Sequence, residues 1–539
     1  MRSCRWLASA LLALLLFPQW SYAGDFMDTR LTFAIADNNL LAGPGETNPN
    51  SPSTGFNAGR RNTLFFDNYN TRFSGFETLS HAVLYKKMPS FFKNLTTAAA
   101  LVVRMNYAAD RSSRAFELTD AGSYIFMDYD LGSSKNIKRN FQVTAFPLSS
   151  TRFRLGYSFR ISWGGDSTYP RRSVVSPAPG VKFQLNHDFN SKTGIYLFAS
   201  AKTVLLQKRI REYDDPNDKE NSEFVERIEE ETAYGVLGGF GLRVGDFRIE
   251  GGGAFFDKGT FSNPNVQGEP VYFYGFSGQM SYSYGMPIGV SIDFRLYKND
   301  PQMPAKFFKP EKYEPGKFSF NVAAEASYLV NLLEDPDTFG GIVPSPGIAA
   351  DINFRMKYGY FRMHADIVFR DLGFILRDVP GFVPFQAFSE KQKISPEFFA
   401  AVGVDYYIKG AHLTIGLKGG VQVPATFQGN IPEEVTGNQG SIPASLKGEQ
   451  IVMVRDEGDF VLIPLVDQNG NAITVLPIVS AKANFKLQFS EFLSLVGEIL
   501  FTLDNNDTRL TRDQITGIAF REFTQPIRFG FNMMLQARF

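Results

Sequence analysis

Residues 527–539 read IRFGFNMMLQARF, and their side chains alternate between apolar and polar or small. Every second residue from Ile527 to Phe539 is apolar, and only Met534 adds a large apolar side chain to the opposite phase. A period of two is that of a β-strand, in which successive side chains point to opposite faces. The stretch therefore predicts a strand with one apolar face at the end of the chain.

The same alternation recurs upstream in pairs of runs joined by short turns, which predicts β-hairpins. The pairs are 481–489 with 493–503, 400–408 with 413–423, 348–358 with 361–369, 232–244 with 247–256, and 272–284 with 288–297. Weaker strand candidates are 31–35, 77–85, 95–107, 124–131, 141–147, 153–163, 181–185, 195–205 and 318–330. The candidates number about 20. Neighbouring strands of an antiparallel barrel must alternate in direction. When directions are assigned in this way from residue 539 backwards, the predicted set of strands breaks the alternation at two places, between 95 and 163 and near 299–316.

The first 23 residues have the pattern of a secretory signal peptide. Arg2 and Arg5 precede an apolar run from Leu7 to Phe17, and small residues stand three and one positions before the expected cleavage site ahead of Gly24. No later apolar run approaches the roughly 20 residues that a membrane-spanning helix needs. The sequence therefore predicts an exported chain without a transmembrane helix.

Composition narrows the class further. The single cysteine lies in the predicted signal peptide, so the expected mature chain forms neither disulfides nor a thiolate site. Acidic and basic residues balance at 55 each, which does not favour binding of nucleic acid. The chain has 53 Phe, 22 Tyr and 48 Gly, as expected for aromatic strands separated by polar loops.

The terminal strand resembles the last strand of bacterial outer-membrane β-barrels, which characteristically ends in an aromatic residue. The resemblance implies that the barrel-assembly machinery recognises Phe529, Phe531, Met533, Leu535 and Phe539. It also implies an all-β fold: a single antiparallel transmembrane barrel of about 16 to 20 strands, with 18 as the central expectation, over residues 24–539. Short turns would face the periplasm. Long extracellular loops are expected near 37–76, 207–231, 370–396, 424–472 and 504–525.

Two alternatives stay open for this architecture. The terminal strand could be an ordinary amphipathic edge strand, and the proline- and lysine-rich stretch 299–316 could link a larger barrel to a smaller one. The run from Phe92 to Trp163 also resembles porins of the phosphate-selective kind, but it contains no motif that would transfer binding residues.

The alternation assigns the polar phase of each strand to the lumen. If Phe153, Leu155, Tyr157, Phe159, Ile161 and Trp163 face lipid, then Arg152, Arg154 and Arg160 face inward. The same rule places further basic residues inside: Arg104, Lys182, Lys202, Arg243, Arg248, Arg295, Arg355, Lys357, Arg362, Lys418, Lys482, Lys486 and Arg528. The acidic inward set is about half as large: Asp128, Asp130, Glu250, Asp293, Glu325, Asp351, Asp366, Asp405 and Glu498.

The eight basic residues on which a selective lumen would depend most are Arg104, Arg152, Arg154, Arg160, Arg355, Arg362, Lys482 and Lys486. Basic groups in a low-dielectric pore attract anions. The alternative is that the inward charges neutralise one another in a packed or plugged lumen and select no ion.

No enzyme, metal or cofactor motif is found in the sequence. The four histidines are scattered, and no nucleophile motif such as G-x-S-x-G occurs. The acidic loop 212–231 could bind divalent cations shared with lipopolysaccharide, but it lacks the EF-hand order of ligands, and a solvated surface loop is the simpler interpretation. We therefore expect no catalytic residue.

The leading functional hypothesis is a porin-like channel for passive diffusion of small solutes, with a preference for anions. The loop 424–471 is the candidate constriction, since its apolar run Phe460–Val466 favours a buried position; an extracellular loop with its own small hairpin is the equal alternative. The other hypotheses are an exporter of an acidic polysaccharide or a hydrophobic compound, and a structural barrel that anchors an envelope assembly. Expected partners are outer-membrane lipids, lipopolysaccharide, the assembly machinery and small solutes. The oligomeric state stays open.

Overall fold

The structure is a computed structural model of the full chain. It describes residues 26–37, 39–42, 53–56, 81–88, 90–109, 114–120, 122–134, 137–148, 150, 152–158, 160–165, 168–169, 174–176, 179–213, 224–261, 266–285, 313–377, 386–390, 392–430, 449–456, 459–465, 471–512 and 519–538. The predicted signal peptide and Phe539 lie outside these residues.

Eighteen antiparallel strands pair in an unbroken ring. The wall strands are β1(Phe26–Asp37), β3(His81–Met88), β4(Leu95–Ala109), β6(Tyr124–Asp130), β7(Arg139–Phe146), β11(Gly180–Asp188), β12(Thr193–Tyr213), β13(Phe224–Val244), β14(Phe247–Thr260), β15(Pro270–Tyr284), β16(Phe318–Glu334), β17(Ile342–Tyr358), β18(Phe361–Arg370), β20(Glu397–Ile408), β21(Leu413–Val423), β25(Ile478–Gln488), β26(Leu493–Leu503) and β29(Ile527–Arg538). Each pairs with the next.

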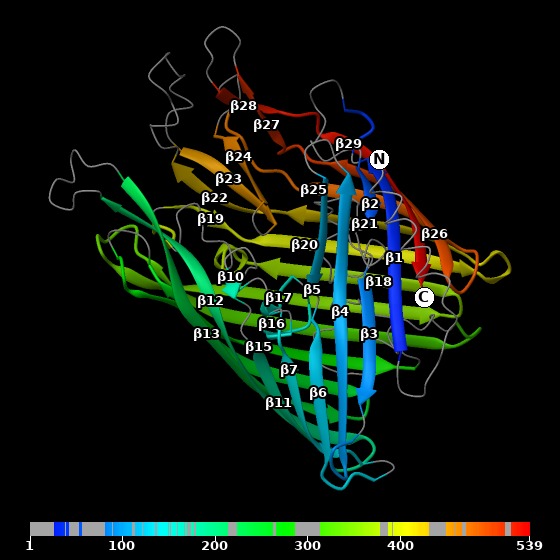
Figure 1. Ribbon diagram of the computed structural model, residues 1–539. Helices are drawn as coiled ribbons and strands as arrows, with labels where there is room; N and C mark the ends of the chain where they lie inside the picture. The colour runs from blue at the N-terminus through cyan, green and yellow to red at the C-terminus, as the bar shows by residue number, and fades with distance from the viewer. Residues whose placement is uncertain are drawn as a thin grey trace, which may run out of the picture.

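The pairing between β1 and β29 closes the ring. Their register runs from Arg30 opposite Arg538 to Asp37 opposite Phe531, and Figure 1 shows the blue first strand beside the red last one. The closed all-β barrel and the central expectation of 18 strands are thereby confirmed. Closure leaves no wall strand with an unpaired edge, as a membrane-spanning sheet requires.

Three shorter strands lie in line with wall strands and occupy the same position in the ring as those strands. β2(Ser53–Phe56) lies in line with β3 between β1 and β4; β5(Arg114–Asp120) continues β6 along β4; and β10(Val174–Ser176) continues β11 along β12. These interrupted positions lie in the first part of the chain, where the alternation predicted strands less clearly.

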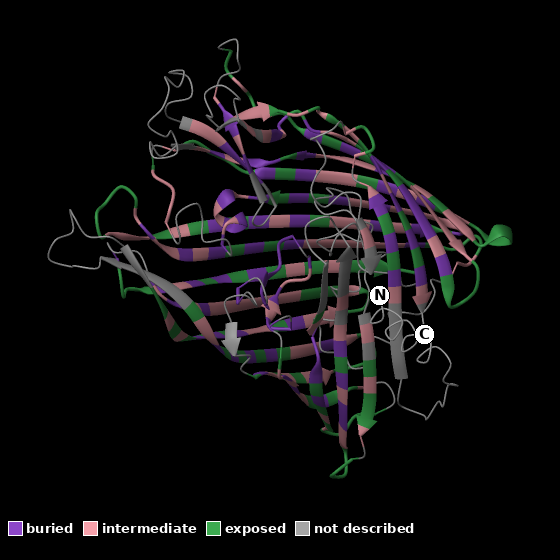
Figure 2. Ribbon diagram, turned by 45° about the horizontal axis from the view of Figure 1, so that its top comes forward, coloured by how far each residue is buried: buried purple, intermediate pink, exposed green. Residues whose placement is uncertain are grey.

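Apolar side chains cover the outside of the ring, while the polar phase is buried inside. On β17, Ile348 and Ile352 are about half exposed, whereas Asp351 and Arg355 are buried. Figure 2 shows the resulting bands of buried and exposed residues along the strands. This pattern is inverted relative to a water-soluble barrel, and it forms an apolar outer band of the kind that contacts lipid.

The two rims of the barrel differ. Two- to six-residue turns such as Gly245–Asp246 and Gly359–Tyr360 lie at the rim where the chain begins and ends. Most longer connections lie at the opposite rim; the exception is the connection of residues 285–317, because β15 ends and β16 begins at the rim with the short turns. The strand directions now agree around the whole ring, and four of the five predicted hairpins are confirmed.

Two predicted strands are wrong, and each explains one conflict of direction in the sequence. β15 pairs directly with β16 from Phe273–Asn331 to Tyr284–Phe320, which leaves no place in the wall for the predicted strand 288–297. That stretch lies outside the described residues. The predicted strand 153–163 is not part of the wall either, because β7 pairs directly with β11. Its residues lie inside the barrel.

The described residues of the loop 424–471 form β22(Ala425–Asn430), β23(Glu449–Asp456) and β24(Asp459–Pro464), which join β19(Ile394–Ser395) in a four-stranded sheet at the rim with the long connections. The hairpin of β23 and β24 agrees with the alternative prediction of a small hairpin in this loop, while the inward constriction stays a prediction. The apolar run Phe460–Val466 was predicted to favour a buried position. Two of its described residues, Val461 and Ile463, are buried within this sheet.

Two small elements complete the rim. A hairpin of β27(Thr508–Arg512) and β28(Ala519–Phe523) follows β26, and the one-turn helix α4(Leu372–Ile375) follows β18. None of the helices in the described part of the chain is long and apolar enough to cross a membrane.

Candidate functional site

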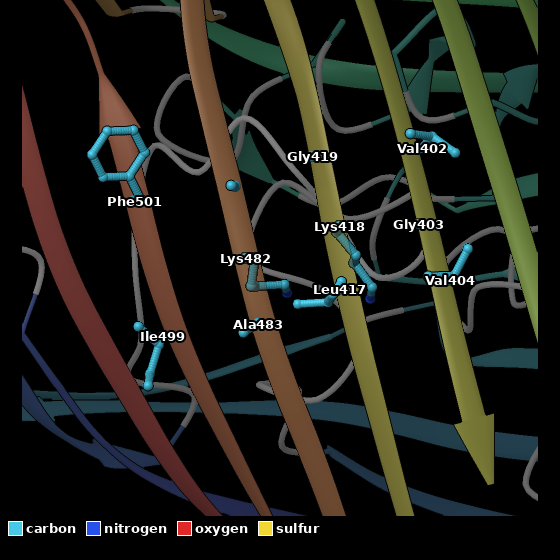
Figure 3. A pocket seen from close by; sticks show the side chains of 11 residues that line it. Val402, Gly403, Val404, Leu417, Lys418, Gly419, Lys482, Ala483, Ile499 and Phe501 are labelled. Atoms are coloured by element: carbon cyan, nitrogen blue, oxygen red, sulfur yellow. The ribbon is translucent and has the colours of Figure 1, made fainter.

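A hollow of 510 Å³ lies on the outer wall, where β20, β21, β25 and β26 meet (Figure 3). Its floor is formed by the small outward residues Gly419 and Ala481, which are direct neighbours across two strands. Leu417, Ile499 and Phe501 surround it, and all three are exposed on the outer face. The hollow therefore faces the lipid side and not the lumen.

The candidate site lies inside the barrel, on a segment that we call the inner segment, residues 148–169. It joins β7 to β10 from the rim with the long connections. Among its described residues, β8(Arg154–Leu155) and β9(Trp163–Gly164) pair over two residues, and most of the others are irregular. Such an irregular segment must find partners for its backbone outside itself when it is buried.

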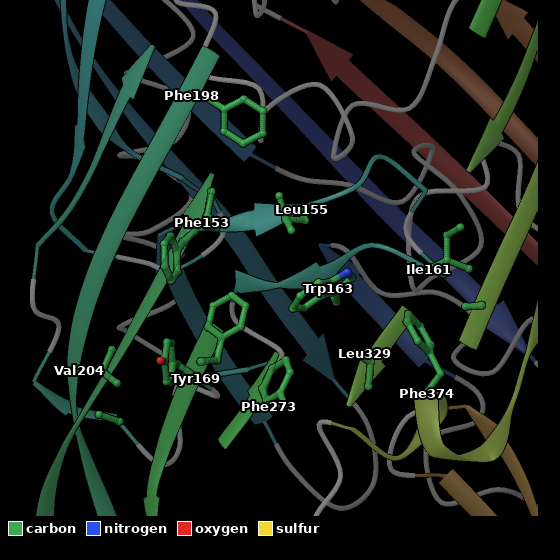
Figure 4. Packing of buried hydrophobic residues seen from close by; sticks show 14 of the residues in the cluster. Phe153, Leu155, Ile161, Trp163, Tyr169, Phe198, Val204, Phe273, Leu329 and Phe374 are labelled. Atoms are coloured by element: carbon green, nitrogen blue, oxygen red, sulfur yellow. The ribbon is translucent and has the colours of Figure 1, made fainter. Parts of the chain in front are cut away.

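One side of the inner segment packs against apolar residues that point into the lumen. Phe153, Ile161 and Trp163 are fully buried. They belong to a cluster that includes Phe256 of β14 and Phe273 of β15. Figure 4 shows Phe153, Trp163 and Phe273 gathered in this cluster. The prediction that the apolar residues of this stretch face lipid is wrong, because they fill the interior instead; Phe159 lies outside the described residues.

Aromatic rings fix the geometry of this contact. Trp163 meets Phe256 edge-on at 5.7 Å between ring centroids, and Phe153 meets the same ring edge-on at 5.3 Å. Phe256 and Phe273 stack at 5.1 Å. Such pairs contribute about 0.5–1.5 kcal/mol each beyond the burial of area.

Glycines in the wall leave room for the inner segment. β13 and β14 place Gly238 opposite Gly253 and Gly239 opposite Gly252. A Cβ atom at Gly252 would lie 2.9 Å from Leu155 Cδ2 and 2.9 Å from the Gly238 carbonyl oxygen. A larger residue there would push the inner segment away from the wall.

Polar wall side chains bind the backbone of the tip, which we define as residues 156–162. The amides of Tyr157 and Ser158 donate to the Glu325 carboxylate, at 2.8–3.0 Å. The next carbonyls accept from the wall in turn: Arg160 O from Arg370 Nη1 at 3.4 Å, Ile161 O from Ser327 Oγ at 3.0 Å, and Ser162 O from Arg377 Nη2 at 3.2 Å. Five backbone groups are thus satisfied by four wall and rim side chains.

The Glu397 carboxylate forms a second anchor. It is fully buried and accepts from Arg370 Nε at 3.0 Å and from Gln422 Nε2 at 2.7 Å. Arg160 of the tip approaches the same carboxylate, with Nη1 at 3.4 Å. The guanidinium of Arg160 also lies over the Phe399 ring, 4.2 Å from its centroid.

Tyr157 joins the tip to β14, two strands from Glu325 in the same part of the wall. Its hydroxyl donates to Glu250 of β14 at 2.5 Å, and Tyr196 of β12 donates to the same carboxylate. Burial, together with the negative charge of Glu250, holds the pKa of the Tyr157 hydroxyl well above its usual range. The hydroxyl therefore remains protonated as a donor at physiological pH.

The rest of the described lumen is lined by buried charges, many of them in ion pairs. Lys482 Nζ lies 2.6 Å from Glu498 Oε1, and both side chains are inaccessible to solvent. Arg362 Nε lies 2.8 Å from Asp405 Oδ2. Among the described residues, nine basic and eight acidic side chains are buried, so the buried charges nearly balance. The inward excess of basic charge stays a prediction, because half-buried residues such as Arg362 and Lys486 are outside this count.

The structure distributes the predicted basic residues over several places. Arg355 and Lys482 are buried on the wall, Arg362 and Lys486 are half-buried on it, and Arg104 belongs to β4. Arg152, Arg154 and Arg160 do lie inside the barrel, but on the inner segment. They do not share one face: Arg152 Nε donates to Gly122 O at 2.5 Å, far from the Glu397 anchor of Arg160.

The residues proposed as an assembly signal lie on β29. Phe529, Met533 and Leu535 are exposed on the outer face and Phe531 is half-buried, while Asn532, Met534 and Gln536 alternate with them as buried residues. Phe539 lies outside the described residues.

Sequence analysis missed the residues that organise the tip. Glu325 was assigned to the lumen without a role, and Arg370, Arg377, Glu397 and Gln422 were not assigned there at all. The run Gly251–Gly253 was the available signal, because three consecutive glycines in a strand indicate close approach of another part of the chain. In the part of the chain that the structure describes, no group of three or more His, Cys, Asp or Glu side chains could hold a metal ion.

No family model matches the sequence, and no curated protein matches it. Among solved structures, OccK2 (OpdF) of Pseudomonas aeruginosa in complex with glucuronate is 7% identical, with 95% of this chain and 97% of that chain covered and a TM-score of 0.38. The anion-selective porin from Comamonas acidovorans is 7% identical, with 96% and 99% covered and a TM-score of 0.32.

A third similar structure is Wzi of Escherichia coli, an outer-membrane carbohydrate-binding β-barrel involved in group 1 capsule assembly. It is 10% identical, with 95% of this chain and 84% of that chain covered and a TM-score of 0.34. At these identities and scores, the likeness identifies neither a solute nor a mechanism for this chain. The chain's own pairings establish a closed, antiparallel, 18-stranded β-barrel with an apolar outer face.

Proposed function

We propose that this chain is an outer-membrane channel for passive diffusion of small solutes, narrowed by the inner segment. The observation that carries the proposal is that the tip is bound across the lumen by side chains from β16, β18 and β20. A segment held at one level of a barrel limits the size of what can pass, and nearby charges act strongly there because the wall has a low dielectric constant.

The apolar outer band supports an outer-membrane location, with lipids and lipopolysaccharide as its surroundings and the assembly machinery as the partner that would recognise β29. A preference for anions belongs to the proposal as its finer part. The near balance of buried charges leads us to expect a weak preference.

Planar-bilayer recording of the purified chain tests this function. We expect steady ohmic current steps and, under a salt gradient, a small reversal potential of the sign that indicates anions. A variant that lacks residues 150–169 should give larger steps, because the constriction is removed. If neither protein conducts, the channel function is wrong.

The same recording separates the alternatives. A full-length chain that stays closed while the shortened variant conducts would mean that the inner segment plugs the barrel. That outcome would overturn passive diffusion and favour an exporter that a partner must open. A folded barrel that never conducts in either form would favour a structural anchor.

A further inference from the structure

The tip of the inner segment contains two kinds of buried backbone group, and they differ in what it costs to leave them without a partner. The amides of Tyr157 and Ser158 point at the wall, as do the carbonyls of Arg160, Ile161 and Ser162. A buried N–H without an acceptor is rarer in proteins than an under-satisfied C=O, which has two lone pairs. The side chain that accepts the two amides should therefore matter most.

That side chain is Glu325, and a single carboxylate serves both amides. Hydrogen bonds to an ionised acceptor are about twice as strong as neutral ones. The tip is shaped for this acceptor: Gly156 has a φ of +86°, and a Cβ atom there would overlap Glu325 Oε1. Consecutive amides after a left-handed residue form a concave site for an anion.

The position of Glu325 in the wall strengthens the argument. Its direct cross-strand neighbour is Asp351, and both side chains are buried. Like charges directly opposite one another are unfavourable in a sheet. The two amides of the tip supply positive dipole ends that compensate the Glu325 charge, so the tip and the carboxylate stabilise each other.

We propose that Glu325 is the positioning residue that holds the tip across the lumen, and that the open cross-section of the barrel depends on its carboxylate. The expected effect of Glu325 on conduction rests on the proposed channel function, but its role in positioning the tip does not. Without the carboxylate, the Tyr157 and Ser158 amides lose their acceptor inside the barrel and gain one only by moving into water.

Thiol labelling tests the position of the tip directly. Ser158 is buried, and the chain's only cysteine lies in the predicted signal peptide, so Ser158→Cys places one thiol at the tip. The probe is a trimethylammonium methanethiosulfonate, which is charged and does not enter the lipid phase. We expect slow labelling of Ser158→Cys alone. Adding Glu325→Ala should raise the rate by about tenfold or more, because two charge-assisted hydrogen bonds are lost.

Three further variants make the labelling result specific. Glu325→Gln keeps one carbonyl acceptor and should restore most of the protection. Ser327→Ala removes a single donor to Ile161 O from the same strand and should raise the rate much less than Glu325→Ala. Ser490→Cys, in the exposed turn before β26, should label fast with or without Glu325→Ala and so shows that the reagent reacts equally in both backgrounds, while the folded mobility on gels shows that each barrel has formed. Equal rates for Ser158→Cys with and without Glu325→Ala would overturn the inference.

Current recording then separates the inference from the channel function. Glu325→Ala should increase the proportion of large steps, and Glu325→Gln should resemble the wild type. If the wild type conducts and Glu325→Ala gives the same distribution of steps, the positioning role is wrong while the channel function stands. If no variant conducts, the channel function fails, and the labelling rates alone decide the position of the tip.

Discussion

Single residues in this barrel act mostly by providing hydrogen-bond or ion-pair partners for groups that are buried inside it. Glu397 illustrates this: its one carboxylate accepts from Arg370 and Gln422 and meets Arg160, so three elements depend on it. Breaking such a buried pair costs far more than replacing both partners with apolar groups, because an uncompensated charge is left behind. The first two predictions follow from this asymmetry and from the glycines of the wall.

Replacing Lys482 by Met should destabilise the barrel by about 3–5 kcal/mol, since the buried Glu498 carboxylate would lose its ion-pair partner and keep the hydrogen bond from Asn532 Nδ2 on the neighbouring strand. The double variant Lys482→Met with Glu498→Leu should recover much of that loss. Chemical unfolding in lipid vesicles measures both. A single variant that is no less stable than the double one would contradict the expectation.

Replacing Gly252 by Val should displace Leu155 and cost about 1–3 kcal/mol through overpacking. The displacement moves the inner segment away from β14 within the lumen and should therefore also change the current through the channel. Gly278→Ala is the matched control, because a Cβ atom at that position has no neighbour within 4 Å. Current steps and unfolding of the two variants are to be compared; similar behaviour would show that the close approach at Gly252 does not hold the inner segment.

At the scale of elements, the sequence predicted the wall well and the inner segment poorly, for one physical reason. Period-two alternation indicates that a strand has one apolar and one polar side. It predicts the wall strands β17, β18, β20 and β21 correctly. It does not say whether the apolar environment is lipid or a packed lumen. Residues 153–163 alternate like a lipid-facing strand, yet their apolar side chains pack against Phe256 and Phe273 inside the barrel.

The direction of strands was the better guide at this scale. A ring of antiparallel strands must alternate in direction, and the two places where the alternation failed mark the two wrong strands. The anchors of the tip could not be predicted, because Glu325, Arg370 and Glu397 are far apart in sequence and meet only after the ring has closed and the inner segment has entered it.

The inner segment should be dispensable for the wall, since β7 and β11 pair without it. We expect a chain in which a short glycine-serine linker replaces residues 150–169 to form a barrel that retains its folded mobility on gels. The variant should unfold at lower temperature than the wild type, because the lumen loses the packing of Trp163 and Phe153. Failure to form a barrel would mean that the segment takes part in closing the ring.

At the scale of the whole molecule, the barrel reverses the usual distribution of polarity. Its outer face should therefore tolerate charge poorly at mid-height. Ile352→Arg, at an outward position in the middle of β17, should cost about 2–4 kcal/mol in a bilayer. Ile352→Leu serves as the control. Unfolding in vesicles measures the difference, and an arginine variant as stable as the leucine variant would show that this face does not contact lipid.

The pairing of β1 with β29 has a consequence for the order in which the barrel assembles. Arg30 and Arg538 are neighbours in the wall, so one edge of β1 stays uncovered until β29, the last strand of the chain, has formed. Contacts this distant in sequence form slowly, because a very long loop must be closed first. Until β1 and β29 pair, the incomplete barrel has an unpaired strand edge on which another chain can pair. During that time it depends on a chaperone that covers this edge.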